Sequence, residues 1–182
     1  MNLPNWLTIL RILLAPVVVI LLVEEKRNAA LAIFVLAVLT DGLDGLLARF
    51  YRQHTNLGML LDPVADKLLL GSAFVTLGIL GWVPVWLVIL GVGRDIVLVT
   101  GSVVLYCFTG CLVYPPSLLG KLTTVLQLAV VVGGMMVHGE GVATGFWVLV
   151  WATGIVTLCS GLGYLVRGIE VVAGTSQKVT SA

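Results

Sequence analysis

The sequence predicts an all-α integral membrane protein with about six transmembrane helices. Of its 182 residues, 59% are hydrophobic and only 10% are charged, and the mean hydropathy is +1.13. A soluble domain, by comparison, carries about 25% charged residues. The net charge of +1 and the sparse lysines and arginines argue against nucleic-acid binding, because neutralising a phosphate backbone requires a dense basic surface.

The helices follow from the apolar stretches, since a spanning helix needs about 20 mostly apolar residues. Six stretches are long enough, at roughly 6–23, 29–50, 57–80, 84–106, 118–137 and 143–166. Each is separated from the next by a polar or turn-forming segment. In order, these are the charged turn EEKR, the polar loop RQHTN, the turn GWVP, the break YPPS and the hairpin HGEG.

Six spans place both termini on the same side of the membrane. The basic residues expected on that side are Arg11, Arg49, Arg52, Lys121, Arg167 and Lys178, against Lys26 and Arg27 on the other. The excess of positive charge predicts that the termini face the cytoplasm. We expect a membrane domain over residues 1–172, a disordered polar tail over 173–182, and a first helix that is not a cleaved signal. A bacterial inner membrane fits these features.

The most informative residues are four aspartates between positions 41 and 66. An ionised carboxylate at bilayer depth costs several kcal/mol unless it is paired. Asp41 and Asp44 are three residues apart, and Asp62 and Asp66 are four apart, so each pair shares a helix face. If the second and third spans face each other, the four carboxylates form a pocket suited to divalent cations with oxygen ligands. We expect this site on the cytoplasmic side.

Two other interpretations of these aspartates are open from the residues alone. They could form an ion or proton pathway in a non-enzymatic cation channel or carrier. They could also form structural salt bridges with Arg49 and Lys67.

The spacing of the aspartates resembles the signature of a known family. Residues 41–66 match D-x2-D-G-x2-A-R-x8-G-x3-D-x3-D, which is typical of the CDP-alcohol phosphotransferases. The start LPNWLTILRILLAP resembles the phosphatidylglycerophosphate synthase and cardiolipin synthase branch, and general similarity extends to about residue 167. The resemblance implies an enzyme of phospholipid biosynthesis. It would transfer a phosphatidyl group from CDP-diacylglycerol to an alcohol hydroxyl and release CMP.

The resemblance also implies roles for individual residues. The metal ligands, for Mg²⁺ or Mn²⁺ and with two ions expected, would be Asp41, Asp44, Asp62 and Asp66, with Asp66 also the catalytic general base. The cytidine nucleotide would be bound by Asp44, Gly45, Ala48, Arg49 and Gly58. Such enzymes form homodimers, so we expect a homodimer here.

The acceptor is indicated by charged residues in the fourth and fifth spans. Arg94 and Lys121 are candidates to bind an acceptor phosphate, because guanidinium and ammonium groups recognise phosphate well. The alternative is that Arg94 pairs with Asp95 or with a signature aspartate. The stretch GRDIVLV lacks the second arginine–glutamate pair usual in phosphatidylglycerophosphate synthases. The resemblance therefore favours phosphatidylglycerol as acceptor, as in cardiolipin synthesis, with glycerol 3-phosphate as the alternative.

The small residues are expected to serve packing. This applies to Cys107, Cys111 and Cys159, which have no neighbouring histidine to suggest a zinc site, and to Gly78, Gly81, Gly91, Gly93, Gly133 and Gly134.

Overall fold

The computed structural model describes the backbone of residues 3–51, 56–109, 118–136 and 144–180, and the side chains of residues 9–40, 67–101, 118–136, 144–164 and 166. These residues form six α-helices: α1 (Leu3–Val23), α2 (Arg27–Tyr51), α3 (Asn56–Ile79), α4 (Val85–Thr109), α5 (Leu118–Met136) and α6 (Thr144–Thr180). The all-α class is confirmed, and eleven of the twelve helix ends lie within a few residues of the predicted ones.

The exception is the end of α6, which continues to Thr180. We expected a disordered tail after Val172, and the described backbone differs from that expectation. The segment contains no proline, and extending an existing helix costs far less than nucleating a new one.

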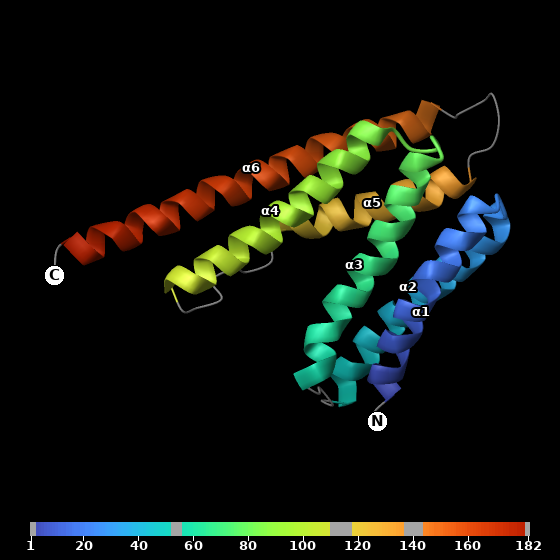
Figure 1. Ribbon diagram of the computed structural model, residues 1–182, viewed down its shortest axis with the longest axis horizontal. Helices are drawn as coiled ribbons and strands as arrows, with labels where there is room; N and C mark the ends of the chain where they lie inside the picture. The colour runs from blue at the N-terminus through green and yellow to red at the C-terminus, as the bar shows by residue number, and fades with distance from the viewer. Residues whose placement is uncertain (1–2, 52–55, 110–117, 137–143, 181–182) are drawn as a thin grey trace.

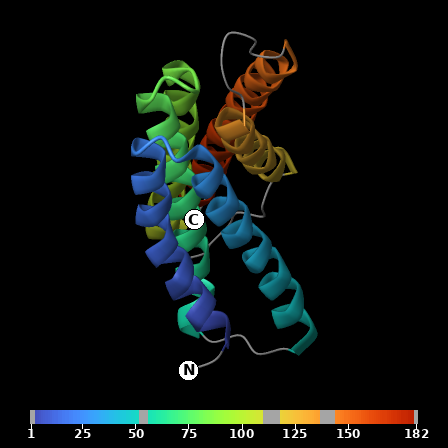
Figure 2. The same cartoon turned by 90° about the vertical axis from the view of Figure 1, so that its right-hand side faces the viewer.

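The helices converge at one end of the molecule and spread apart at the other (Figure 1). α1 packs against both α2 and α3, while α5 and α4 each pack against α6. α5 also contacts α2 and α3, so it joins the α1–α3 group to the α4–α6 pair (Figure 2). The N-terminal end of α1, the end of α2 and the start of α3 lie at the spread end, where Figure 2 shows the end of α2 apart from the other two.

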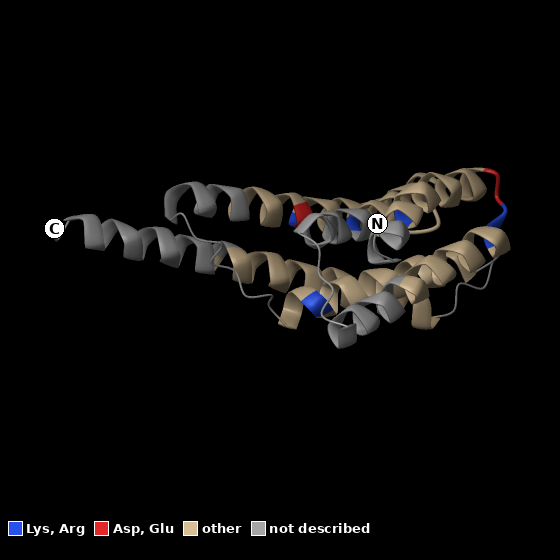
Figure 3. Ribbon diagram, turned by 90° about the horizontal axis from the view of Figure 1, so that it is seen from below, with Lys and Arg blue, Asp and Glu red and all other residues tan. Residues whose placement is uncertain are grey.

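At the convergent end, a cation–π contact joins two turns. The Arg27 guanidinium lies 3.6 Å from the centroid of the Trp82 ring, which connects the α1–α2 turn to the α3–α4 turn through a cation–π contact. Gly81 has a φ of 74°, a backbone conformation that residues with a Cβ rarely adopt. Apart from the α1–α2 turn, the described charged residues are few (Figure 3). Arg11, Lys67, Arg94 and Asp95 lie within helices, and Lys121 lies in the first turn of α5.

The core is apolar, and so is much of the outer surface. Phe34, Leu77, Leu87 and Val131 are almost fully buried, whereas large apolar side chains are exposed on every helix, up to 84% for Leu118. A soluble monomer rarely exposes so much apolar surface, but lipid tails would cover it. Among the described residues, Leu118–Met136 and Thr144–Tyr164 are long and apolar enough to cross a membrane.

Glycines bring several helices into close contact, as expected. A Cβ on Gly78 would lie 2.7 Å from Val88 Cγ2, and one on Gly133 would lie 3.0 Å from Phe146 Cδ2. Gly91 and Gly134 are similarly close to neighbouring side chains. Gly81 instead shapes a turn, and a Cβ on Gly93 would meet no atom within 4 Å.

We expect Gly154→Ala to destabilise the α4–α6 contact. Its Cβ would lie 2.7 Å from Trp86 Cζ3, and the Trp86 ring is already held against Trp151 with ring centroids 5.1 Å apart. Overpacking of this kind costs about 1–3 kcal/mol. Gly163→Ala is the matched control on the same helix, because its Cβ would meet nothing within 4 Å. Thermal unfolding in detergent should show a lower Tm for the first variant only, and equal Tm values would contradict this account.

Candidate active site

The four signature aspartates lie on the two helices that the sequence predicted. Asp41 and Asp44 are in α2, one turn apart, and Asp62 and Asp66 are one turn apart in α3. These parts of α2 and α3 lie at the same spread end of the bundle (Figure 1). The side chains of residues 41–66 are outside the described part of the structure, and with them the expected nucleotide-binding residues Gly45, Ala48, Arg49 and Gly58.

The described residues form a cavity that begins directly after the signature. Its volume is about 260 Å³, and it lies among α2, α3, α4 and α5. Lys67, the residue after Asp66, forms part of its wall. The apolar wall comes from Phe34, Val38, Leu69, Leu70, Phe74, Val92 and Leu128, and the polar wall from Lys67, Arg94, Asp95, Thr124 and Gln127.

Arg94 is the most buried charge in this cavity. Its side chain is 8% exposed, its Nη1 donates to Asp95 Oδ1 at 2.9 Å, and its Nη2 donates to the Gly120 carbonyl at 3.4 Å. The pairing with Asp95 is the alternative that the sequence left open. It leaves the guanidinium incompletely satisfied, because Nε has no hydrogen-bond partner among the described atoms. A buried donor without a partner is uncommon and calls for an explanation.

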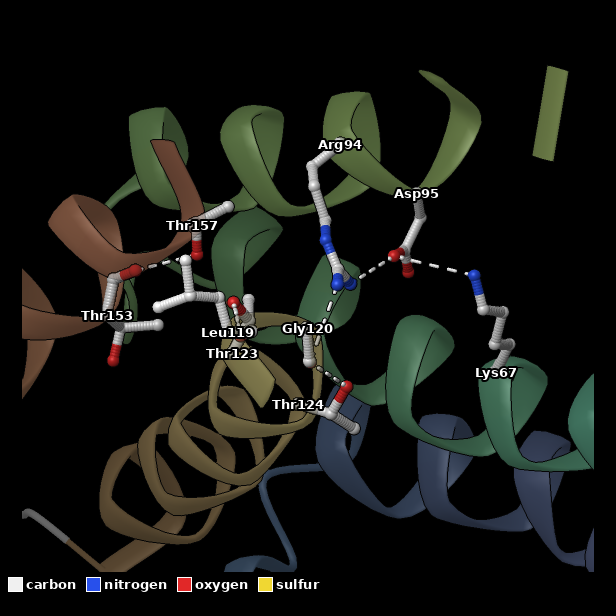
Figure 4. Close-up of polar contacts among 9 residues, drawn as sticks. All are labelled: Lys67, Arg94, Asp95, Leu119, Gly120, Thr123, Thr124, Thr153 and Thr157. Atoms are coloured by element: carbon white, nitrogen blue, oxygen red, sulfur yellow. Dashed lines mark hydrogen bonds and ion pairs between the residues drawn. The ribbon is translucent and has the colours of Figure 1, made fainter. Parts of the chain in front are cut away.

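Asp95 connects this arginine to Lys67. The Lys67 Nζ lies 3.5 Å from the same oxygen, Oδ1, that accepts the bond from Arg94. Figure 4 shows Asp95 between the two cations, with Arg94 extending from α4 towards Gly120 on α5. Two cations therefore share one carboxylate, and this described part of the cavity wall keeps a single net positive charge.

The structure does not bring Lys121 to this site. Lys121 is exposed on α5 and does not line the cavity. The helical period explains why, since the buried face of α5 carries Gly120, Thr123 and Gln127, and Lys121 falls between them.

Thr124 and Gln127 line the cavity instead, and the sequence did not identify them as site residues. Gln127 is 5% exposed, and a Cβ on Gly91 would lie 2.5 Å from its Nε2. The glycine thus makes room for an amide that lines the cavity. A glutamine inside an apolar span, seven residues after Gly120 and therefore on the same helix face, was the available signal.

Arg11 is a second residue whose burial the sequence did not predict. It is only 4% exposed within α1, the helix that packs against both α2 and α3. A lone arginine inside an apolar span was the signal, since such a charge needs an anionic partner.

No group of three or more metal-binding side chains occurs among the described residues. The four aspartates stay the predicted ligands, and their side chains lie outside the described residues.

The comparison with known sequences agrees with the signature. Residues 1–159 match the CDP-alcohol phosphatidyltransferase family. The chain belongs to this family. Its members are membrane proteins that act as transferases in phospholipid biosynthesis and generally use divalent cations.

Relatives with three different names are similar to this chain. A Mycobacterium tuberculosis protein named a probable phosphatidylglycerophosphate synthase is 36% identical, over 97% of this chain and 86% of its own length. The human cardiolipin synthase (CMP-forming) is 32% identical over 94% of this chain, which spans only 63% of that protein. The Bacillus subtilis CDP-diacylglycerol–glycerol-3-phosphate 3-phosphatidyltransferase is 32% identical, over 93% of this chain and 96% of its own length. The suspected branch is confirmed.

Proposed function

We propose that this CDP-alcohol phosphatidyltransferase transfers the phosphatidyl group of CDP-diacylglycerol to phosphatidylglycerol, forming cardiolipin and releasing CMP. The observation that carries this proposal is the cavity that starts at Lys67, directly after the signature. Cationic side chains and an apolar wall meet in it, so it suits the phosphate and the chains of a lipid acceptor.

The proposed roles follow the order of the residues along α2 and α3. Asp44, Gly45, Ala48, Arg49 and Gly58 bind the cytidine nucleotide, where the small residues leave room for it. Asp66 accepts the proton of the attacking acceptor hydroxyl, whose oxygen then bonds to the donor phosphorus as the bond to CMP breaks. Arg94 holds the acceptor phosphate, and the exposed Lys121 has only a weaker role in attracting anionic headgroups.

Asp41, Asp44, Asp62 and Asp66 fit a pair of divalent cations, because an all-carboxylate set provides the oxygen ligands that Mg²⁺ and Mn²⁺ prefer. When bound, such ions would neutralise the charge that develops on the donor pyrophosphate.

The proposed setting is a bacterial inner membrane. Six spans place the aspartates at the cytoplasmic side, where a water-soluble CMP can leave, and the enzyme acts as a homodimer. The arrangement of the helices supports this topology. The α1–α2 and α3–α4 turns lie at one end, and the ends of α2 and α3 that carry the aspartates lie at the other (Figure 1).

Glycerol 3-phosphate is the second candidate acceptor. It is favoured by the similarity to the Bacillus subtilis enzyme, whose name includes this substrate, over nearly the full length of both chains. Phosphatidylglycerol is favoured by the apolar wall of the cavity, which a small water-soluble acceptor would not use.

Product identification tests this proposal. Purified protein is given CDP-diacylglycerol and Mg²⁺ or Mn²⁺ with each acceptor separately, and the lipid products are identified by mass spectrometry. We expect cardiolipin from phosphatidylglycerol, and complete loss of CMP release when EDTA removes the cations. Phosphatidylglycerophosphate as the only product would show that the acceptor is glycerol 3-phosphate and not phosphatidylglycerol. Ion transport without any CMP release would favour the channel or carrier.

A further inference from the structure

A second hollow lies next to the cavity, on the outer side of α3 and α4. It is an open groove of about 720 Å³ lined by residues of α1, α3 and α4. Half of its lining residues are aliphatic, and these are Val19, Leu68, Val75, Val92, Ile96 and Val99. On a membrane protein, a groove of this chemistry suits lipid chains.

The groove and the cavity share four lining residues, which are Lys67, Gly71, Val92 and Asp95. The two hollows therefore border each other at these residues, and the Lys67–Asp95 ion pair is the charged part of the shared wall. Both side chains are partly accessible, at 49% and 34% exposed. A lipid with its chains in the groove would thus present its headgroup beside this ion pair.

The charges at this wall are unequal. Lys67 and Arg94 both contact Oδ1 of Asp95, at 3.5 and 2.9 Å. Among the described residues, one carboxylate neutralises one of the two cations, which leaves one positive charge on this part of the wall for a ligand. A lipid phosphodiester carries one negative charge, whereas a phosphate monoester carries about −1.5 to −2 near neutral pH. The remaining charge matches the diester.

We infer that Asp95 is a positioning residue that selects the acceptor by charge: it holds Arg94 and Lys67 so that the cavity accepts a lipid phosphodiester entering from the groove and disfavours a phosphate monoester. This inference rests on the proposed phosphatidyl transfer and adds to it the residue that sets acceptor preference. Asp95 acts through the two cations and takes no part in the chemical step.

A competition assay with charge variants tests this assignment. CDP-diacylglycerol is supplied with phosphatidylglycerol and glycerol 3-phosphate in one reaction, and the ratio of cardiolipin to phosphatidylglycerophosphate is measured. This ratio does not depend on how much of the protein is folded. Wild type should give mainly cardiolipin. Asp95→Asn should lower the ratio at least about fivefold, because the uncovered cation attracts the more highly charged monoester more strongly.

Lys67→Gln should raise the ratio, since removing a cation weakens binding of the monoester more than of the diester. Asp95→Glu, which keeps the charge, should leave the preference for phosphatidylglycerol in place. A purely structural role for Asp95 would not move the two ratios in opposite directions. If Asp95→Asn forms no product, the product ratio of Lys67→Gln tests the inference alone: a rise supports it, and a fall or no change contradicts it.

Three results would overturn the inference while leaving phosphatidyl transfer intact. These are a wild type that prefers glycerol 3-phosphate, an unchanged ratio in Asp95→Asn, and ratios that move in the same direction in both charge variants. If wild type forms no product from either acceptor, the proposed function itself fails, and the inference fails with it.

Discussion

Asp66→Asn should reduce CMP release from CDP-diacylglycerol by about a thousandfold. An amide of the same shape cannot accept the proton of the attacking hydroxyl, and general-base catalysis contributes about 10²–10⁴ in rate. The fall should appear in kcat, with a smaller change in the KM for the donor, because the nucleotide-binding residues are intact. Steady-state CMP release in mixed detergent–lipid micelles measures both constants.

Glu24→Gln is the control for the loss of one carboxylate. Glu24 lies in the turn at the opposite end of the bundle, where it pairs with Lys26 at 2.8 Å, so its activity should stay close to that of wild type. The proposed role of Asp66 would be wrong if Asp66→Asn retained more than a tenth of wild-type kcat while folding normally.

Arg94→Gln should raise the KM for the phosphatidylglycerol acceptor by about 10- to 100-fold. A hydrogen bond to a charged group is worth about 1.5–3 kcal/mol, and each 1.4 kcal/mol corresponds to a factor of ten. Asp95 keeps Lys67 as a partner in this variant, so the carboxylate is not left alone. Arg94→Lys should be intermediate, since a point charge cannot contact Asp95, Gly120 and the ligand as a planar guanidinium can.

Lys121→Gln provides the comparison within the same assay. Lys121 is exposed and lies outside the cavity. The KM of Lys121→Gln for phosphatidylglycerol should therefore change by less than about threefold, because only the attraction of anionic lipid is weakened. Equal effects of Arg94→Gln and Lys121→Gln would show that the cavity is not where the acceptor phosphate binds.

The helices could be predicted from the sequence because their cause is local. An apolar stretch long enough to cross a bilayer must satisfy its own backbone hydrogen bonds, and helices do so without help from distant residues. The breaks at EEKR and GWVP are equally local. EEKR is a run of charged residues, and GWVP starts with a glycine whose φ is 74°. The structure has a turn at each of these segments. The end of α6 was not predictable in this way, because its polar residues favour neither outcome strongly.

The four aspartates could also be predicted, since their spacing and chemical type carry the signal. Spacings of three and four residues place each pair one turn apart on a helix, and the structure confirms helical backbone at both pairs. Family membership follows from the same positions and from the match over residues 1–159.

By itself, the sequence determined the helix positions, the carboxylate signature and the family. Only the tertiary structure decided which side chains line the cavity together with Lys67. It places Gln127 there and Lys121 outside it, and it joins Arg94 and Lys67 through one oxygen of Asp95. The reason is physical. Spacing along one helix follows its own period, but contacts among α3, α4 and α5 depend on how closely Gly91 lets these helices approach.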